Sequence, residues 1–259
     1  MYRGQHRAAE GNLMVRRLAV TALLTALSVY AQGGRGGRGP QQARTAKAAA
    51  LYDLTGYWVA VVTEDWRYRM MTPLKGDAAG VLLNAAGRKV AEGWDPARDE
   101  VAGEQCRSYG APALMSVPGR LHITWPDEET LKIESDNGQQ TRLLHFDSVE
   151  SQGGDWQGYS KAVWEVVPAG RGDAPVGSLR VITTRLRPGY LRKNGVPYSA
   201  STTVTEYLDR VKEPDGNAYL VVTTTVEDPI YLAQPFLTAS HYRKQADSAG
   251  WKPRPCTAR

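Results

Sequence analysis

The sequence is poor in the residues and patterns that carry familiar catalytic chemistry. It has two cysteines and four histidines, and it contains no HExxH, HxH, CxxC, GxSxG or P-loop pattern. Their absence argues against a zincin, a CxxC redox centre, a nucleophile elbow and a P-loop nucleotide site. Only three histidines follow residue 50, each on a different expected strand, and a three-histidine metal site would need all of them. We therefore expect no metal and no cofactor.

Long apolar runs are also lacking. The run over residues 18–31 is 14 residues long, and a membrane-spanning helix needs about 20. It follows the basic pair Arg16 and Arg17 and closes with small residues at Ser28 and Ala31, which is the layout of a secretory signal peptide. We expect residues 1–31 to be a signal peptide, with Met14 as the natural start, and no stable membrane insertion of the mature chain. The protein is then exported, to the periplasm or the extracellular space.

The positive net charge belongs to the first part of the chain. Residues 1–50 carry eight of the 32 basic residues and one of the 27 acidic ones, so residues 51–259 have a net charge of −2. Phosphate binding needs a clustered basic face, so we expect no nucleic-acid partner. Residues 32–50 are rich in Gly, Arg and Ala without apolar periodicity, which predicts a flexible linker. Residues 51–259 are long enough for one sizeable domain.

Cys106 and Cys256 are an even pair of cysteines in a chain that we expect to leave the cytoplasm. An oxidising compartment favours a disulfide between them. Such a bond would tie the end of the chain to a segment 150 positions earlier.

Alternating apolar residues and short turns predict a mainly β domain. One segment, residues 84–94, is typical of a helix, with Asn84 as N-cap and Pro96 beyond its end. About ten strands with short turns favour an antiparallel β-barrel with one short helix, because closure removes exposed strand edges. A two-sheet β-sandwich is the alternative. The strands are expected at residues 55–63, 66–72, 120–125, 130–135, 140–146, 159–167, 178–187, 202–211, 218–227 and 236–244.

Strand alternation also suggests candidate catalytic residues. Glu206 shares a strand face with Val204 and Leu208, and Asp228 follows an apolar face at the end of the next strand. If these faces line the interior, two carboxylates point inward, where a raised pKa would suit a general acid and base. Structural hydrogen bonding of both carboxylates is the competing interpretation. His145 shares its face with Leu143 and is expected to point inward too.

The aromatic residues suggest a ligand pocket. Seven Trp and thirteen Tyr accompany only two Phe, and such rings with a polar handle often line sites for sugars or aromatic ligands. Core packing would account for the same residues. Arg192 belongs to a local basic cluster that can meet an anionic group or can simply be solvated. The candidate ligand-binding residues are Arg192, Trp66, Trp164, Tyr207 and Tyr231.

Two resemblances follow from short motifs. The strand start Gly56-Tyr57-Trp58 resembles the opening strand of lipocalin-like (calycin) barrels. Several segments between residues 80 and 240 together resemble an uncharacterised family of exported bacterial β-rich proteins, which implies export and one β-rich domain but no reaction. The chain departs from that family at Ala200, where an acidic residue is commoner, and it lacks an Asp-Gly-Arg stretch after Phe146. The matching segments are residues 84–88, 94–95, 104–106, 156–160, 164–165, 192–199, 205–206 and 226–232.

Three functions remain open at this stage. The first is an exported β-barrel that binds a small apolar, aromatic or sugar-like ligand in its mouth, with Arg192 and the carboxylates orienting the polar end. The second is a secreted hydrolase, lyase or isomerase that uses Glu206 and Asp228 as acid and base, aided by His145. The third is a cell-surface interaction module. The expected partner is a small-molecule ligand, and the oligomeric state is not readable.

Overall fold

The computed structural model describes residues 44–147, 153–168, 170 and 175–259. The expected signal peptide and residues 32–43 of the expected linker lie outside these residues. The last part of the expected linker already contacts the folded domain. Ala46 is buried, and the Lys47 backbone N–H donates to the Glu128 carbonyl oxygen at 3.1 Å.

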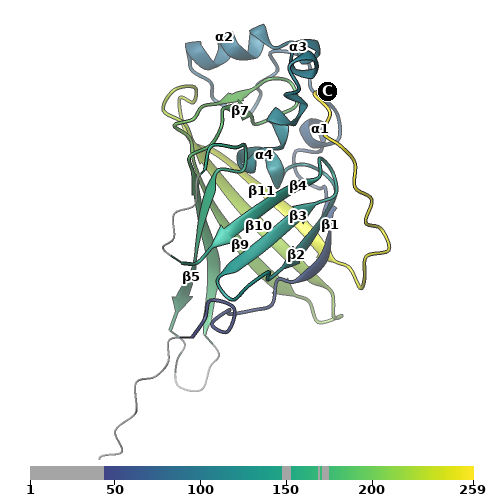
Figure 1. The fold of residues 1–259 in the computed structure, drawn as a ribbon, viewed down its shortest axis with the longest axis vertical. Helices are drawn as coiled ribbons and strands as arrows, with labels where there is room; N and C mark the ends of the chain where they lie inside the picture. Colours follow the sequence, from purple (N-terminus) through teal and green to yellow (C-terminus); the bar gives the residue numbers. More distant parts are fainter. Residues whose placement is uncertain (1–43, 148–152, 169, 171–174) are drawn as a thin grey trace, which may run out of the picture. The chain divides into compact units, whose positions relative to one another are not determined.

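Nine strands close into a barrel, because β1 pairs with β2 on one edge and with β11 on the other. The order around the ring is β1, β11, β10, β9, β6, β5, β4, β3, β2 (Figure 1). The strands of the ring are β1 (Gly56–Val61), β2 (Arg120–Thr124), β3 (Thr130–Ser135), β4 (Gln140–His145), β5 (Tyr159–Val167), β6 (Val176–Thr184), β9 (Thr203–Lys212), β10 (Ala218–Glu227) and β11 (Phe236–Lys244).

The closed ring confirms the expected barrel, and the alternative of a two-sheet sandwich is wrong. The expectation of an entirely antiparallel barrel needs one correction. β4 and β5 pair in parallel, with Leu144 opposite Ser160 and His145 opposite Lys161. No hairpin joins these two strands, because β5 begins beside the end of β4 and continues in the same direction.

The helices are short and more numerous than the sequence predicted. The expected helix at residues 84–94 is α2 (Ala85–Gly93), and the Asn84 side chain caps it by accepting from the Gly87 backbone N–H at 2.9 Å. The expected strand at residues 66–72 is wrong, since Trp66–Arg69 forms α1 instead. The others are α3 (Pro96–Val101), the 3₁₀-helix η1 (Gln105–Tyr109) and α4 (Ala111–Leu114).

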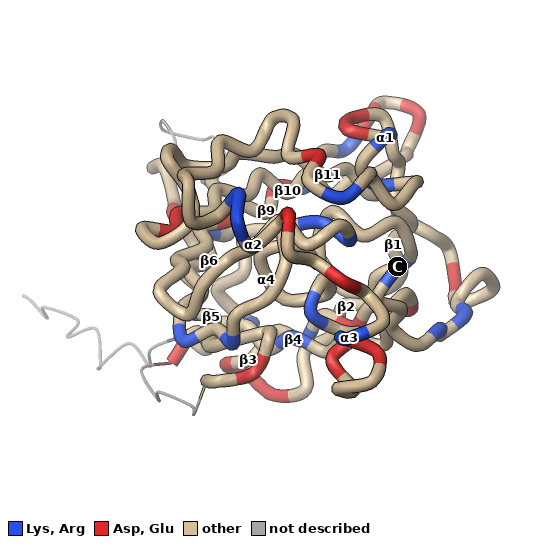
Figure 2. The backbone as a smooth tube through the Cα atoms, turned by 90° about the horizontal axis from the view of Figure 1, so that it is seen from above, with Lys and Arg blue, Asp and Glu red and all other residues tan. Residues whose placement is uncertain are grey.

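These helices and the two-stranded sheet of β7 (Gly189–Tyr190) and β8 (Pro197–Tyr198) cover one end of the barrel, which we call the cap end (Figure 1). Seen from above, α2, α3 and α4 lie over the ring of strands and α1 lies at its margin (Figure 2). A second apolar cluster joins the cap to the strand ends. It includes Leu83, Ala91, Leu191, Val196, Val204 and Val226.

Side chains fill the barrel below this cap. The inward side chains of alternate strand positions form a cluster that includes Trp58, Ile133, Leu179, Leu220 and Tyr242, all of them fully buried. Burial of such apolar surface contributes roughly 25 cal/mol per Å² to folding. The barrel interior is therefore mainly a packed core.

Candidate ligand-binding site

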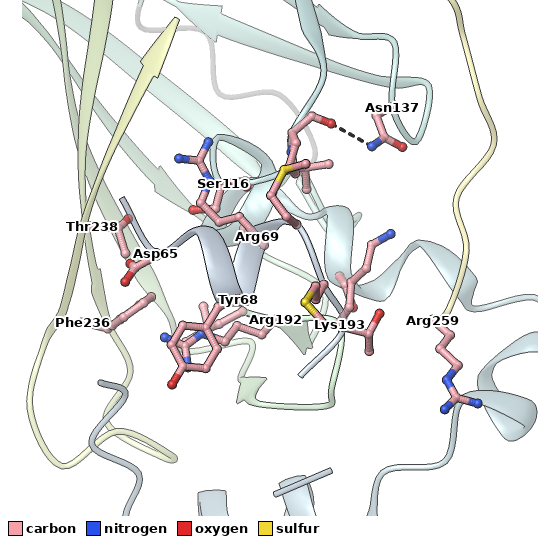
Figure 3. Close-up of a pocket in the computed structure, with 18 of the residues that line it drawn as sticks. Asp65, Tyr68, Arg69, Ser116, Asn137, Arg192, Lys193, Phe236, Thr238 and Arg259 are labelled. Carbon is pink, nitrogen blue, oxygen red and sulfur yellow. Dashed lines mark hydrogen bonds between the residues drawn. The ribbon is translucent and has the colours of Figure 1, made fainter. Parts of the chain in front are cut away.

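A pocket of about 480 Å³ opens at the cap end, outside the packed core. Its walls come mainly from α1 with the residues after it, α4 with the residues after it, the β7–β8 turn and the start of β11, and Ser108 of η1 and Asn137 of the β3–β4 turn contribute too (Figure 3). The end of the chain adds Arg254 and Arg259. The volume lies within the range of about 300–1,000 Å³ that is typical of small-molecule sites.

The pocket wall carries a strong excess of positive charge. In the described part of the chain, five cationic side chains line it and Asp65 is its one acidic residue. The wall differs in this from the expected folded domain as a whole, which is slightly acidic. The cationic residues are Arg69, Arg192, Lys193, Arg254 and Arg259.

Arg69 has a deeply buried side chain. Its side chain is 4% exposed, and its Nε donates to the Ser116 carbonyl oxygen at 2.9 Å. Neither terminal nitrogen has a hydrogen-bond partner among the described residues. The nearest carboxylate, that of Glu64, lies 4.0 Å from Nη1 and is itself 2.8 Å from His241 Nδ1. A buried guanidinium with unused N–H donors is costly unless another group accepts from them.

Arg192 is held between aromatic rings. Its guanidinium carbon lies 4.0 Å from the centre of the Tyr68 ring and 5.7 Å from that of Phe236. One terminal nitrogen donates to the Ala79 carbonyl oxygen at 2.7 Å. Burial lowers the pKa of Arg192, and the nearby Asp65 offsets part of that effect. The ring stacking fixes the direction of the guanidinium while most of its water is removed.

The turn that carries Arg192 and Lys193 is fixed by Asn194, whose side chain is fully buried. The Asn194 amide donates to the Leu74 carbonyl oxygen at 2.9 Å and to that of Asp77 at 2.8 Å. The β7–β8 turn is thereby bound to the segment that follows α1. Two hydrogen bonds from a buried side chain therefore join these two segments of the cap end.

The end of the chain is held against the pocket by a disulfide. Cys106 and Cys256 are bonded, with their Cα atoms 5.1 Å apart, which confirms the predicted bridge. Lys193 Nζ donates to Thr257 Oγ1 at 3.2 Å, and the Arg254 backbone N–H donates to the Asp136 carbonyl oxygen at 2.7 Å. Arg254 and Arg259 thus reach the pocket only because the last segment is fastened there.

The predicted catalytic carboxylates lie elsewhere and both have partners. Glu206 is fully buried inside the barrel, as strand alternation predicted, and forms an ion pair with Arg142. Arg142 also donates to Ser160 Oγ at 3.1 Å and to Thr183 Oγ1 at 2.7 Å. The arrangement has the character of a buried structural network.

Asp228 directly follows β10 and organises the turn after it. Its carboxylate accepts from the Thr202 hydroxyl at 2.6 Å and from the backbone N–H groups of Ile230 at 2.7 Å and Tyr231 at 2.9 Å, as well as from that of Ser199. Burial pushes the pKa of Asp228 up, but these hydrogen bonds outweigh it and hold the pKa below its usual range. Such a carboxylate is poorly suited to act as a general acid at neutral pH.

His145 does not point inward as expected. Leu143, on the same face, is 42% exposed, whereas Arg142 and Leu144 are the buried residues of β4. The face assignment was wrong because the inward set of this strand contains an arginine. His145 instead stacks on the Tyr159 ring, with ring centres 5.3 Å apart.

Of the predicted ligand-binding residues, only Arg192 lines the pocket. Trp66 is exposed on α1, and Trp164 packs edge-on against Tyr52 at the barrel core, 4.9 Å between ring centres. Tyr207 and Tyr231 are half-buried away from the pocket wall. No sequence signal pointed to Arg69, because the strand expected there hid its position, and none pointed to Arg254 and Arg259.

Comparisons with protein-family models, with curated proteins and with solved structures found no match to this chain. The resemblance to an exported bacterial family therefore stays a prediction. Among the residues that the structure describes, no cluster of three or more His, Cys, Asp or Glu side chains is arranged to hold a metal ion. No helix in the described ranges is both long and apolar enough to cross a bilayer.

Proposed function

We propose that this protein is an exported binding protein whose ligand is a small organic anion, a carboxylate or a phosphate ester, held in the cation-lined pocket. The observation that carries the proposal is the excess of cationic side chains around an open pocket. Arg69 is one of them, and its buried terminal nitrogens have no hydrogen-bond partner among the described residues. A carboxylate or phosphate oxygen satisfies such donors best, often through two parallel hydrogen bonds.

The character of the remaining wall supports an organic anion in preference to an inorganic one. Met70, Met71, Leu191 and Phe236 line the same pocket as the cations. A ligand with an apolar body and an anionic end would contact both kinds of surface. This refines the expectation of an apolar or aromatic ligand in the barrel mouth with Arg192 at its polar end, and it replaces the two carboxylates by cationic side chains.

Export is part of the proposal, and the disulfide supports it. A bond between Cys106 and Cys256 forms and persists most readily in an oxidising compartment. Soluble anions from the surroundings would reach the pocket there without crossing a membrane.

Calorimetric titration with three matched probes tests the proposal. We expect 4-phenylbutyrate to bind, 4-phenylbutanol to bind more weakly and 4-phenylbutylammonium not to bind, with the affinity for the anion falling as salt is added. Arg69→Met should weaken binding of the anion about 10- to 100-fold, since a hydrogen bond to a charged group contributes about 1.5–3 kcal/mol.

The control is Arg67→Met, which removes a cation from the same helix but outside the pocket wall. It should leave the affinity unchanged. Equal binding of the anionic and cationic probes, no binding of 4-phenylbutyrate, or an equal loss in both variants would overturn the proposal. Circular dichroism of Arg69→Met shows whether the variant is folded, and Arg192→Met serves as the second test if it is not.

A further inference from the structure

The segment that forms one rim of the pocket presents large apolar side chains to solvent. Trp66, Met70, Met71 and Leu74 are each between 59% and 78% exposed. We call residues 66–74 the apolar rim. Trp66 and Met70 are four positions apart across α1, so their side chains lie on the same side of the segment. Single exposed apolar residues are ordinary, but a group within nine consecutive residues marks a surface that something covers.

The rim is a supported structure. The Arg69 side chain is tied to the Ser116 carbonyl oxygen on its inner side, and the Leu74 carbonyl oxygen accepts from the buried Asn194 amide. These contacts hold the backbone against the cap while the apolar side chains stay exposed to solvent. A held segment with exposed large side chains is suited to contact a second surface.

The rim is continuous with the cation-lined wall. Met70 and Met71 line the same pocket as three cations, Arg69, Arg192 and Lys193. Figure 3 labels these three cations. Exposed Trp, Met and Leu beside basic groups are typical of proteins that lie on an anionic bilayer, where the apolar side chains enter the interface and the cations meet phosphate groups. A second copy of this chain fits this surface less well, because two such pockets face to face would bring like charges together.

We propose that the apolar rim docks the cap end on a bilayer that contains anionic phospholipid, and that the pocket receives the headgroup phosphate. This inference rests on the proposed anion site and adds the source of the anion. Trp66, Met70 and Leu74 supply the apolar contact, and Arg69, Arg192 and Lys193 supply the charge.

Vesicle flotation of the full chain tests the inference. We expect the protein to float with vesicles of equal parts phosphatidylglycerol and phosphatidylcholine, and not with vesicles of phosphatidylcholine alone. The rim variant Trp66→Ser/Leu74→Ser changes two exposed residues outside the pocket wall and should reduce flotation about tenfold or more, because two large apolar side chains no longer leave water. Brominated acyl chains should quench tryptophan fluorescence in the wild type and much less in Trp66→Phe.

The matched control is Val167→Ser/Val176→Ser, which removes two exposed valines from the end of the β5–β6 hairpin, at the opposite end of the barrel from the cap (Figure 1). It should float like the wild type. Equal flotation with both kinds of vesicle, an equal loss in the control, or unchanged flotation of the rim variant would overturn the inference. So would dimerisation in the absence of vesicles that the rim variant abolishes, since the rim would then cover a second copy.

The titration with 4-phenylbutyrate separates the two proposals. The rim variant should keep its affinity for this soluble probe, because neither Trp66 nor Leu74 lines the pocket. A protein that binds the probe but no vesicle refutes the membrane inference alone. A protein that floats with anionic vesicles but binds no probe refutes the proposed function.

Discussion

Asp228 shows how single polar residues are fixed inside this protein. Two backbone N–H groups after it, one before it and a hydroxyl all donate to its carboxylate, so the charged form is preferred although the group is buried. Its pKa is lowered in the folded state, whereas an unfolded aspartate titrates at about 3.9. The stabilisation is therefore present above about pH 4 and is lost as the pH falls through the lower, folded-state pKa.

Asp228→Asn should lower the free energy of unfolding at neutral pH by about 1–3 kcal/mol, because the amide cannot satisfy the same donors. The difference from the wild type should narrow below about pH 4, where the wild type loses the contribution of its carboxylate. Urea denaturation from neutral pH to below about pH 4 measures the free energy of unfolding of both proteins and so the difference between them. Asp215→Asn, in the exposed turn between β9 and β10, is the control and should change little. A difference that stays constant with pH would contradict the argument.

For Glu206, the sequence predicted the direction of the side chain but not its partner. Alternation along β9 correctly placed its side chain in the interior, because the spacing of strand residues decides their face. It did not reveal Arg142, which lies 64 positions away and meets Glu206 only across the closed ring. A charged residue in an otherwise apolar pattern usually faces solvent. The wrong face of β4, the strand of Arg142, was therefore expected to point toward the interior.

At the scale of elements, the β7–β8 turn depends on a glycine. Gly195 has a φ of +82°, and a Cβ there would clash with the Trp94 side chain. Backbone conformation and close packing therefore both require glycine at this position. The turn in question is the one that presents Arg192 and Lys193 to the pocket.

Gly195→Ala should destabilise the protein by more than Gly216→Ala does. Gly216 also has a positive φ, of +90°, but a Cβ added there would meet no described atom within 4 Å, so alanine carries only the conformational cost of about 1–2 kcal/mol. Urea denaturation gives the free energy of unfolding of both variants, and the difference between the two values measures the cost of the contact with Trp94. An equal decrease in the free energy of unfolding of the two variants would contradict this, because the cap would then have adjusted its packing around the added methyl group.

The segment around α1 shows why an element can be mistaken. Alternating aromatic and basic residues at Trp66–Arg69 predict a half-buried strand. A strand there would need a neighbour, and both edges of β1 are already occupied by β2 and β11. The segment therefore turns into a short helix, and this exposes the rim.

At the scale of the whole molecule, the strand pattern was largely readable. The bounds of β3, β5, β10 and β11 agree with the residues predicted from alternation and turns. The β7 and β8 strands were missed, because two residues carry no periodicity. The parallel pairing of β4 with β5 was missed because sequence order alone suggests that neighbouring strands form hairpins.

The disulfide connects redox state to ligand affinity. Replacing both Cys106 and Cys256 by serine should lower the free energy of unfolding by about 2–5 kcal/mol. It should also weaken binding of 4-phenylbutyrate, because Arg254 and Arg259 flank Cys256 and would no longer be held at the pocket. Titration of the wild type with and without reductant should show the same loss, and the serine variant should not respond to reductant. Unchanged affinity after reduction would contradict this role.

The pairing of β1 with β11 has a consequence for the order of assembly. The ring has no partner for one edge of β1 until residues near Lys244 are available, although β2 follows far earlier in the chain. During synthesis that edge stays open, and an open strand edge invites wrong pairing. The barrel can therefore close only after residues 236–244 have emerged, so the strands made before them wait for the last strand of the ring.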